Sequence, residues 1–403
     1  MLLAFSLPFF YKYSTVAIAL IFFLCLVEIV QTKKVPPIRV HWFLPFLFLY
    51  YTLSELLTGG SYLALQKRHL LILFPLALAL SVNYQGPNLR PRVFKSFIVA
   101  NLLAILICVV RAFVQSITIQ DGEWIFNPRT LENTTHDFLT SSVMGGNYFF
   151  GEDFSYFQHP TYWGIQLVFA QYLVAEVFNT VGKRGKAGLI VTYFVFLGAM
   201  FLLSSKAVIL TSLIVAFWIL FRIRIPVAAK ASAIAGCILI GTFFVFFNPR
   251  LKVFVDTFSI KQFTHPDPNA RYGHDLRILS WDASIDLIRE HWFAGVGEAN
   301  KTPALVDVYK KKGYIVPAEQ QLNSHNQYLE FLVGGGIIGF GLFMTGILNL
   351  SIMAFRDRDY VLLAFVAIIA FNSLFETLLD RHVGVLFFSV FVSFFTTRRQ
   401  SLT

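Results

Sequence analysis

The tripeptide Ser324-His325-Asn326 is the segment of this chain best suited to chemistry. It ends a long polar stretch and opens an apolar one, so we expect His325 where an aqueous loop meets a membrane helix. A histidine side chain changes its charge near neutral pH and can take a proton from a hydroxyl group. His325 is therefore a candidate general base. The alternative is that it only caps the helix expected to begin near Asn326.

Three basic residues are candidates for binding a phosphate or pyrophosphate group. Lys206 lies where two apolar segments meet with almost no loop between them, and a cation so close to hydrocarbon suggests function. Arg271 and Arg277 lie in the largest polar segment. Ammonium and guanidinium groups form charge-assisted hydrogen bonds with phosphate oxygens. The alternatives are a Lys206 that snorkels to the outer headgroups and ordinary surface arginines.

His159 lies at the start of another apolar segment, with Tyr162 and Trp163 close behind. Glu152, Asp153 and His159 could together bind a divalent ion, but two adjacent carboxylates and one distant histidine lack metal-ligand spacing. The aromatic residues equally suit a membrane-interface belt. We therefore predict no metal site and no cofactor.

The elements that must position these residues are transmembrane helices. Hydrophobic residues make up 56% and charged residues 14% of the 403, whereas a soluble domain carries about 25% charge. Apolar runs of spanning length occur near 14–31, 42–58, 67–83, 93–116, 160–179, 188–203, 207–222, 228–247, 326–350, 359–375 and 381–397. Leu2–Phe10 could be a truncated twelfth. The predicted fold class is an all-α polytopic transmembrane bundle of about 12 spans.

Basic residues in the short loops predict the orientation of the chain. With these spans, one side receives Lys33, Lys34, Arg39, Arg90, Arg92, Lys95, Lys183, Arg184, Lys186, Arg222, Arg224, Lys230, Arg356, Arg358, Arg398 and Arg399. That side is therefore cytoplasmic. The opposite segment 117–159 carries Asp121, Glu123, Glu132, Asp137, Glu152 and Asp153 against Arg129 alone. The net charge of +10 thus reflects loops beside anionic lipid, not nucleic-acid binding.

The predicted domains are transmembrane helices over 1–247, interrupted by the outer segment at about 117–159, a large periplasmic loop over 248–325, and C-terminal transmembrane helices over 326–403. The large loop contains an amphipathic helix. Its apolar stripe is formed by Ile278, Trp281, Ile285, Ile288 and Trp292, and its polar face by Asp282, Asp286 and Arg289. We expect this helix to lie flat on the membrane surface or to cover a cavity between spans.

These motifs resemble the O-antigen ligase and O-antigen polymerase superfamily of bacterial inner-membrane enzymes. The resemblance rests on Arg277 followed by Trp281, on the glycine-containing segment 291–297, and on the run from Ser324 to Glu330. It covers the topology of the whole chain, but its specific motifs fall within about 204–335. It implies one large periplasmic loop and transfer of a glycan from undecaprenyl pyrophosphate to an acceptor hydroxyl.

The resemblance also implies roles for individual residues. His325 matches the family's loop histidine, which acts as general base, and Arg277 matches the arginine that heads the loop helix. Lys206 stands where many members have arginine, so it keeps the charge but loses the bidentate fork. Many ligases have a second histidine where this chain has Ser324. Arg271, Asn326 and His159 complete the predicted substrate-binding residues, and the specific role of His159 stays open.

The predicted function is a metal-independent, inverting glycosyltransferase of the O-antigen ligase class. Its donor would be a glycan on undecaprenyl pyrophosphate, and its acceptor a hydroxyl of lipid A core or another hydroxyl, at the periplasmic face of the inner membrane. An O-antigen or exopolysaccharide polymerase and a protein O-oligosaccharyltransferase of the same superfamily are alternatives. A transporter is disfavoured, because neither inverted repeats nor paired glycine- or proline-broken helices are evident in the sequence.

Overall fold

The computed structural model of the protein describes residues 1–33, 40–60, 65–66, 68–80, 88–130, 135–178, 181–222, 226–258, 263, 266–271 and 273–397. Of the residues used above for orientation, Lys34, Arg39, Glu132, Arg224, Arg398 and Arg399 lie outside the described residues. The chain packs into two compact units. Unit 1 comprises Met1–Ser14 and Pro87–Phe258, and unit 2 comprises Thr15–Gly86 and Ser259–Thr403. The units are defined by packing, whereas the predicted domains are defined by their location within the membrane or outside it. The division into units therefore does not test the predicted domains.

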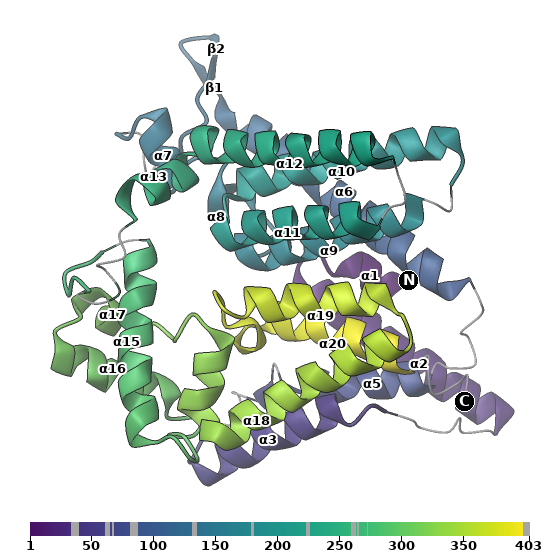
Figure 1. Ribbon diagram of the computed structural model, residues 1–403, viewed down its shortest axis with the longest axis vertical. Coiled ribbons are helices and arrows are strands. Elements are labelled where there is room, and N and C mark those ends of the chain that lie inside the picture. The colour runs from purple at the N-terminus through teal and green to yellow at the C-terminus, as the bar shows by residue number, and fades with distance from the viewer. Residues whose placement is uncertain are drawn as a thin grey trace. The chain divides into compact units, whose positions relative to one another are not determined.

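Unit 1 is built around one buried helix. Its elements are α1 (Leu2–Ser6), α6 (Leu89–Ser116), β1 (Ile117–Gln120), β2 (Glu123–Phe126), α7 (Phe138–Met144), α8 (Gly151–Phe154), α9 (Pro160–Phe178), α10 (Lys183–Leu203), α11 (Lys206–Arg222), α12 (Val227–Phe247) and α13 (Pro249–Thr257). Most side chains of α9 are buried, because α6, α10 and α11 pack around it (Figure 1). Apolar residues lie on every side of α9, which suits this central place, and the buried Gln171 accepts a hydrogen bond from Ser212 on α11 (2.8 Å).

The sequence analysis did not predict the short hairpin of β1 and β2. The two strands are antiparallel, with Ile117 opposite Phe126, and the turn between them has positive φ at Asp121 (53°) and Gly122 (84°). An Asp-Gly pair favours such a turn. Trp124 on β2 is 76% exposed, so the hairpin buries little surface.

Unit 2 contains the remaining helices. They are α2 (Tyr11–Thr32), which begins before the boundary between the units, α3 (Phe43–Leu57), α5 (Leu70–Leu80), α15 (His274–Glu290), α16 (Lys301–Lys312), α17 (Ile315–Glu319), α18 (Gln327–Arg356), α19 (Tyr360–Asn372), η3 (Leu378–Asp380) and α20 (His382–Thr397). Helix α20 packs against α5, and α18 packs against α19 and α3. Helix α15 runs crosswise to α19 and α20 (Figure 1).

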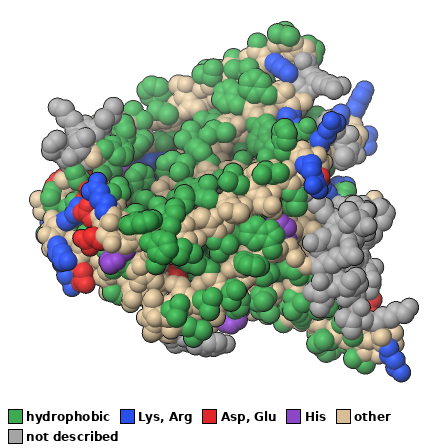
Figure 2. Space-filling view, turned by 60° about the horizontal axis from the view of Figure 1, so that its bottom comes forward, with side chains coloured by type: hydrophobic (Ala, Val, Ile, Leu, Met, Phe, Trp, Pro, Cys, Tyr) green, Lys and Arg blue, Asp and Glu red, His purple; other side chains and the backbone are tan. Residues whose placement is uncertain are grey.

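Apolar helices make this a membrane protein. Five helical segments in the described part are long and apolar enough to span a bilayer: Tyr11–Thr32, Leu89–Ser116, Lys183–Leu203, Lys230–Phe247 and Gln327–Arg356. The other predicted spans are also helical, but they form shorter or more polar helices. Figure 2 shows many hydrophobic side chains exposed on the face that it draws. The helical fold class is thus confirmed, whereas the count of about 12 spans stays a prediction.

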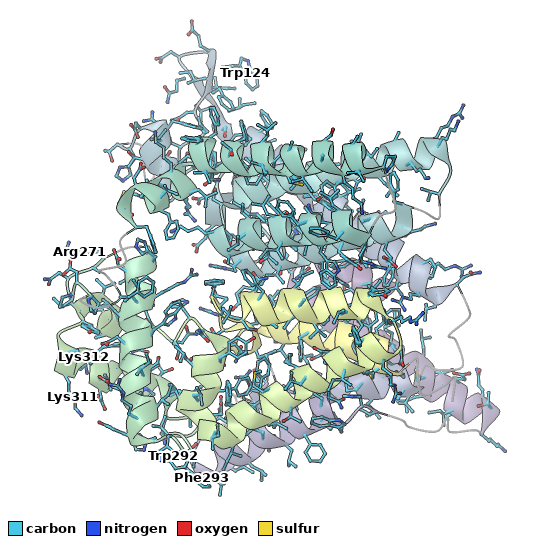
Figure 3. All side chains as sticks on the ribbon, in the orientation of Figure 1. Trp124, Arg271, Trp292, Phe293, Lys311 and Lys312 are labelled. Carbon is cyan, nitrogen blue, oxygen red and sulfur yellow. The ribbon has the colours of Figure 1, made fainter. Side chains whose placement is uncertain are left out.

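The predicted loop helix is present as α15, but its buried face differs from the predicted stripe. Ile278 is buried, as expected, whereas Ile285 is 42% exposed and Trp292 is 61% exposed. The core between α15, α16, α17 and α18 is formed instead by Ala270, Leu279, Ala283, Leu287, Leu305, Tyr309, Tyr314 and Val333. Small residues and leucine allow close packing on that side. Trp292 and Phe293 project beyond the C-terminal end of α15 (Figure 3).

Candidate functional site

Two glycine-containing segments, 291–297 after α15 and 334–336 within α18, join the loop helix to α18. Helix α18 is broken at Gly336, whose φ of 56° is left-handed, and the segment 291–297 after α15 lies against this break. The backbone hydrogen bonds run from Val296 N to Val333 O (2.8 Å), from Gly297 N to Gly334 O (2.8 Å) and from Ile337 N to Trp292 O (2.9 Å). A Cβ on Gly336 would lie 2.3 Å from the carbonyl oxygen of Phe293. Only glycine fits at this contact, so the joint depends on it.

His325 lies in the turn that leads into α18, as the sequence predicts. Its φ of 44° is left-handed, a conformation that a non-glycine residue adopts only when its surroundings hold it there. The side chain of Asn326 accepts hydrogen bonds from the N–H groups of Tyr328 (2.9 Å) and Leu329 (3.1 Å) and so caps the helix. The capping role considered for His325 therefore belongs to Asn326.

The turn is fastened to the segment between α19 and α20. The Asn323 side chain accepts a hydrogen bond from the N–H of His325 (3.1 Å) and donates one to Thr377 Oγ1 (2.7 Å). Gln327 donates its backbone N–H to Ser373 O (2.8 Å), and its side-chain oxygen accepts from Leu379 N (2.6 Å). These bonds bring residues 373–380 beside the histidine.

Glu376 lies in that segment and contacts two of the predicted site residues. Its Oε1 lies 3.6 Å from Nδ1 of His325, and its Oε2 lies 3.6 Å from Nη2 of Arg277. The Glu376 side chain is 9% exposed, compared with 28% for His325 and 32% for Arg277. The structure therefore brings His325 and Arg277 together around a carboxylate that the sequence analysis missed. The available signal was its position in a short loop predicted on the same side as His325.

The buried nitrogen of His325 is the one that faces Glu376. Among the described residues, Nδ1 of His325 is buried without a hydrogen-bond partner, and its 3.6 Å separation from the carboxylate is an ion-pair distance rather than a hydrogen bond. The exposed surface of the side chain consequently belongs to the rest of the ring. Such an arrangement can hold one ring nitrogen inward and present the other.

Arg271 lies before α15 and is exposed, near the end of the helix opposite Trp292 (Figure 3). Arg277, by contrast, lies in the first turns of α15, where the helix direction brings it to Glu376. The two arginines are thus in different surroundings. A role of Arg271 in substrate binding stays a prediction, as does a substrate contact of Asn326.

Lys206 belongs to unit 1, where it is the first residue of α11. The preceding turn has Ser204 in the left-handed region (φ 53°), and Asn248 donates a hydrogen bond to Ser204 Oγ (3.0 Å). Nζ of Lys206 lies 4.4 Å from the ring centroid of Phe254 on α13, a cation–π distance. A role of Lys206 in binding phosphate stays a prediction.

His159 precedes α9, also in unit 1, and its Nε2 lies 3.4 Å from Oε1 of Glu152. Both side chains are well exposed, at 48% and 75%. A hydrogen bond with His159 lowers the pKa of the Glu152 carboxyl. Asp153 instead accepts a hydrogen bond from the N–H of Gly146 (2.7 Å). The predicted substrate role of His159 therefore stays a prediction.

An ion-pair clasp holds α15 to α16. Lys312 contacts both Asp282 and Asp286, and the Tyr314 hydroxyl donates a hydrogen bond to Asp282 (2.7 Å). Burial alone would raise the pKa of Asp282, but the bonds from Lys312 and Tyr314 outweigh it, so the pKa is lowered. The clasp lies on the polar face of α15 that the sequence predicts, and Lys312 projects from α16 in Figure 3.

Comparison with known proteins gives one family match. Residues 191–344 match the family described as O-Antigen ligase. This match supports the resemblance to the O-antigen ligase superfamily. It contains Lys206, Arg271, Arg277, His325 and Asn326, but neither His159 nor Glu376. No curated protein matches the chain.

Proposed function

We propose that the protein is a bacterial inner-membrane glycosyltransferase of the O-antigen ligase class. It would move a glycan from undecaprenyl pyrophosphate to a hydroxyl of lipid A core on the periplasmic side. The coarser assignment, to membrane glycosyltransferases of the O-antigen ligase or polymerase type, rests on the family match and on the apolar helices. The observation that carries the mechanism is the contact of His325 with Glu376 beside Arg277.

In this mechanism His325 is the general base. The negative charge of Glu376 favours a proton on Nδ1 of the neutral ring, which leaves the lone pair of Nε2 to accept the proton of the acceptor hydroxyl. After that transfer, the imidazolium ion is stabilised by the carboxylate at 3.6 Å. Glu376 thus has a positioning and electrostatic role, and His325 performs the proton transfer.

The bond changes then balance without a metal ion. The acceptor oxygen forms a bond to the anomeric carbon of the glycan as its proton passes to His325. The bond from that carbon to the pyrophosphate oxygen breaks, and its electron pair leaves with the pyrophosphate. Attack opposite to the leaving group inverts the anomeric centre. Arg277 and Lys206 are proposed to bind the phosphate oxygens, because fixed cations stabilise the charge that develops on a leaving phosphate.

The experiment that tests this function is deletion of the gene in its native strain, followed by separation of the surface glycolipids. A ligase predicts that long glycan disappears from the lipid A core while lipid-linked polymer accumulates. Capping by single repeats would indicate the polymerase branch instead. Normal glycolipid together with unmodified glycoproteins would indicate a protein O-oligosaccharyltransferase. A strain unchanged in all three respects would overturn the proposal.

A further inference from the structure

A buried ion cluster lies beneath the His325 turn in unit 2. Lys301, the first residue of α16, is 6% exposed. Its Nζ lies 2.7 Å from Oε1 of Glu330, 3.0 Å from Oε2 of Glu298 and 3.3 Å from Oδ1 of Asp380. Burial alone would lower the pKa of Lys301, but the three carboxylates hold it well above its ordinary value. The ammonium group therefore stays charged.

Glu330 connects this cluster to the residue before His325. It lies in the first turn of α18 and is 2% exposed. One carboxylate oxygen contacts Lys301, and the other accepts a hydrogen bond from the backbone N–H of Ser324 (3.2 Å). The hydroxyl groups of Ser324 and Ser284 lie 3.0 Å apart, and both residues are fully buried. Ser324 is thus bonded to α15 and α18, and Glu330 connects it to Lys301 on α16.

The cluster also reaches the segment that carries Glu376. Asp380, four positions further along the chain, contacts Lys301 and accepts a hydrogen bond from Nη2 of Arg68 at 2.7 Å. The guanidinium carbon of Arg68 lies 3.7 Å from the ring centroid of Tyr51. One buried set of ions therefore holds both sides of the histidine: the turn before it and the segment with its carboxylate partner.

Burying five charged side chains is costly, and apolar residues of similar volume are often at least as stable. Buried polar networks can instead fix one geometry, and in the described part of the chain this one leaves only Nη1 of Arg68 among its nitrogen and oxygen atoms buried without a hydrogen-bond partner. His325 is a residue that needs such fixing, because its left-handed φ of 44° persists only where the surroundings determine it. The hydrogen bond from Ser324 to Glu330 acts on the adjacent peptide.

We propose that Lys301 and Glu330 are positioning residues for His325. Lys301 holds the Glu330 carboxylate, Glu330 holds the Ser324 peptide, and this peptide sets the direction of the imidazole ring toward Glu376 and the acceptor. The inference rests on the proposed function, since it assigns a purpose to the geometry of the proposed base. It adds two residues to the site that do not touch the substrate.

The test compares Glu330→Leu with Glu330→Gln in purified protein. Both variants lose the charge, but only glutamine keeps an oxygen that can accept the Ser324 N–H. The donor is undecaprenyl-pyrophosphate-linked glycan extracted from the deletion strain, and the acceptor is the surface glycolipid of that strain. Glu330→Leu should lower kcat by about 10- to 100-fold with donor KM within about twofold, because small displacements of a catalytic group have effects of this size. Glu330→Gln should recover kcat to within about fivefold of wild type.

Two controls separate positioning from general damage. Glu319 on α17 is exposed, so Glu319→Leu makes the same exchange away from the cluster and should leave kcat unchanged. In a His325→Ala background, Glu330→Leu should have no further effect on the residual rate, because it acts through the histidine. An equal loss in both backgrounds, or equal kcat for the leucine and glutamine variants, would overturn the inference.

A single Glu330 substitution leaves Lys301 with fewer partners and could prevent insertion. The same leucine and glutamine pair is therefore repeated with Lys301→Met, which restores the net charge of the cluster. The glutamine variant should again have the higher kcat, but both should be slower than their counterparts with Lys301, because the lysine no longer holds residue 330. His325→Ala, measured in parallel, distinguishes failure of the positioning role from failure of the proposed base. If His325→Ala is inactive while the leucine variants keep wild-type kcat, only the positioning role fails. If His325→Ala keeps wild-type turnover, the proposed base itself fails.

Discussion

His325 and Glu376 lie on opposite sides of helices α18 and α19 in the sequence, yet Nδ1 of the histidine is 3.6 Å from Oε1 of the glutamate. The contact exists because the segment 373–380 is bonded to both Asn323 and Gln327, which flank the histidine. The carboxylate, 9% exposed, is shielded from bulk water. Its charge therefore acts on the ring more strongly than it would at the surface.

The Glu376 contact predicts a graded loss of activity. Glu376→Gln removes the charge but keeps the size of the side chain, so it should lower kcat by about 10- to 100-fold, less than complete loss of a general base, about 10²- to 10⁴-fold. The measurement is turnover of purified protein under saturating donor. Glu319→Gln, at an exposed position of α17, is the matched control and should have wild-type turnover. Wild-type kcat for Glu376→Gln would mean that the carboxylate does not assist His325 and that its role is limited to the contact with Arg277.

The difference between what the sequence predicts and what it misses follows from the range of the interactions. Apolar runs such as 160–179 predicted helices correctly because burial in a membrane depends on local composition. The boundary between the polar loop and α18 likewise placed His325 correctly. Glu376 and the Lys301 cluster were missed because their partners are distant in sequence, and an isolated carboxylate carries no local pattern. The stripe of α15 was partly wrong because hydropathy does not distinguish a core-facing leucine from an outward tryptophan.

The proposed phosphate-binding roles predict separate effects of two cations. Lys206→Ala and Arg277→Ala should each lower activity by about 10²-fold or more, because each removes charge that stabilises the leaving group, while the amount of inserted protein stays normal. Lys206→Arg should keep most activity, since the charge remains. Lys183→Ala, in a predicted cytoplasmic loop, is the control and should have no effect. Wild-type turnover of Lys206→Ala would leave snorkelling as its role. Because the predicted reaction needs no metal ion, removal of divalent ions with EDTA should also leave transfer activity unchanged.

The distribution of basic residues predicts which loops face each side. A topology reporter fused after Lys95, Lys186 or Arg356 should give a cytoplasmic signal, whereas one inserted near Asp121 or Lys310 should give a periplasmic signal. The insertion near Lys310 tests the mechanism as well, because Lys310 lies on α16, which packs against the helix that bears Arg277. A cytoplasmic signal from Lys310 would contradict both the topology and the proposed site of transfer.

The clasp between Asp282 and Lys312 predicts a pH-dependent loop. The pKa of Asp282 is lower in the folded protein than its ordinary value of 3.8. Its stabilising effect is therefore complete above that ordinary value and is lost as the pH falls through the lowered pKa. Hydrogen–deuterium exchange of α15 and α16, corrected for intrinsic rates, should be faster in Asp282→Asn than in wild type at pH 7, and the difference should shrink near pH 3. Asp307→Asn, on the exposed face of α16, should match wild type at both values.

The sharpest prediction concerns His325 itself. His325→Ala should lower transfer by about 10²- to 10⁴-fold, while the protein still inserts and still binds lipid-linked donor, because the Asn326 cap and the Glu330 contact to Ser324 do not involve the imidazole. His325→Gln keeps a hydrogen-bonding side chain of similar reach but cannot take up the proton, so it should be nearly as inactive. The measurements are transfer to acceptor and donor binding in the same preparations. Near-normal transfer by His325→Gln would mean that the ring only orients the acceptor, and the base would then have to be another group.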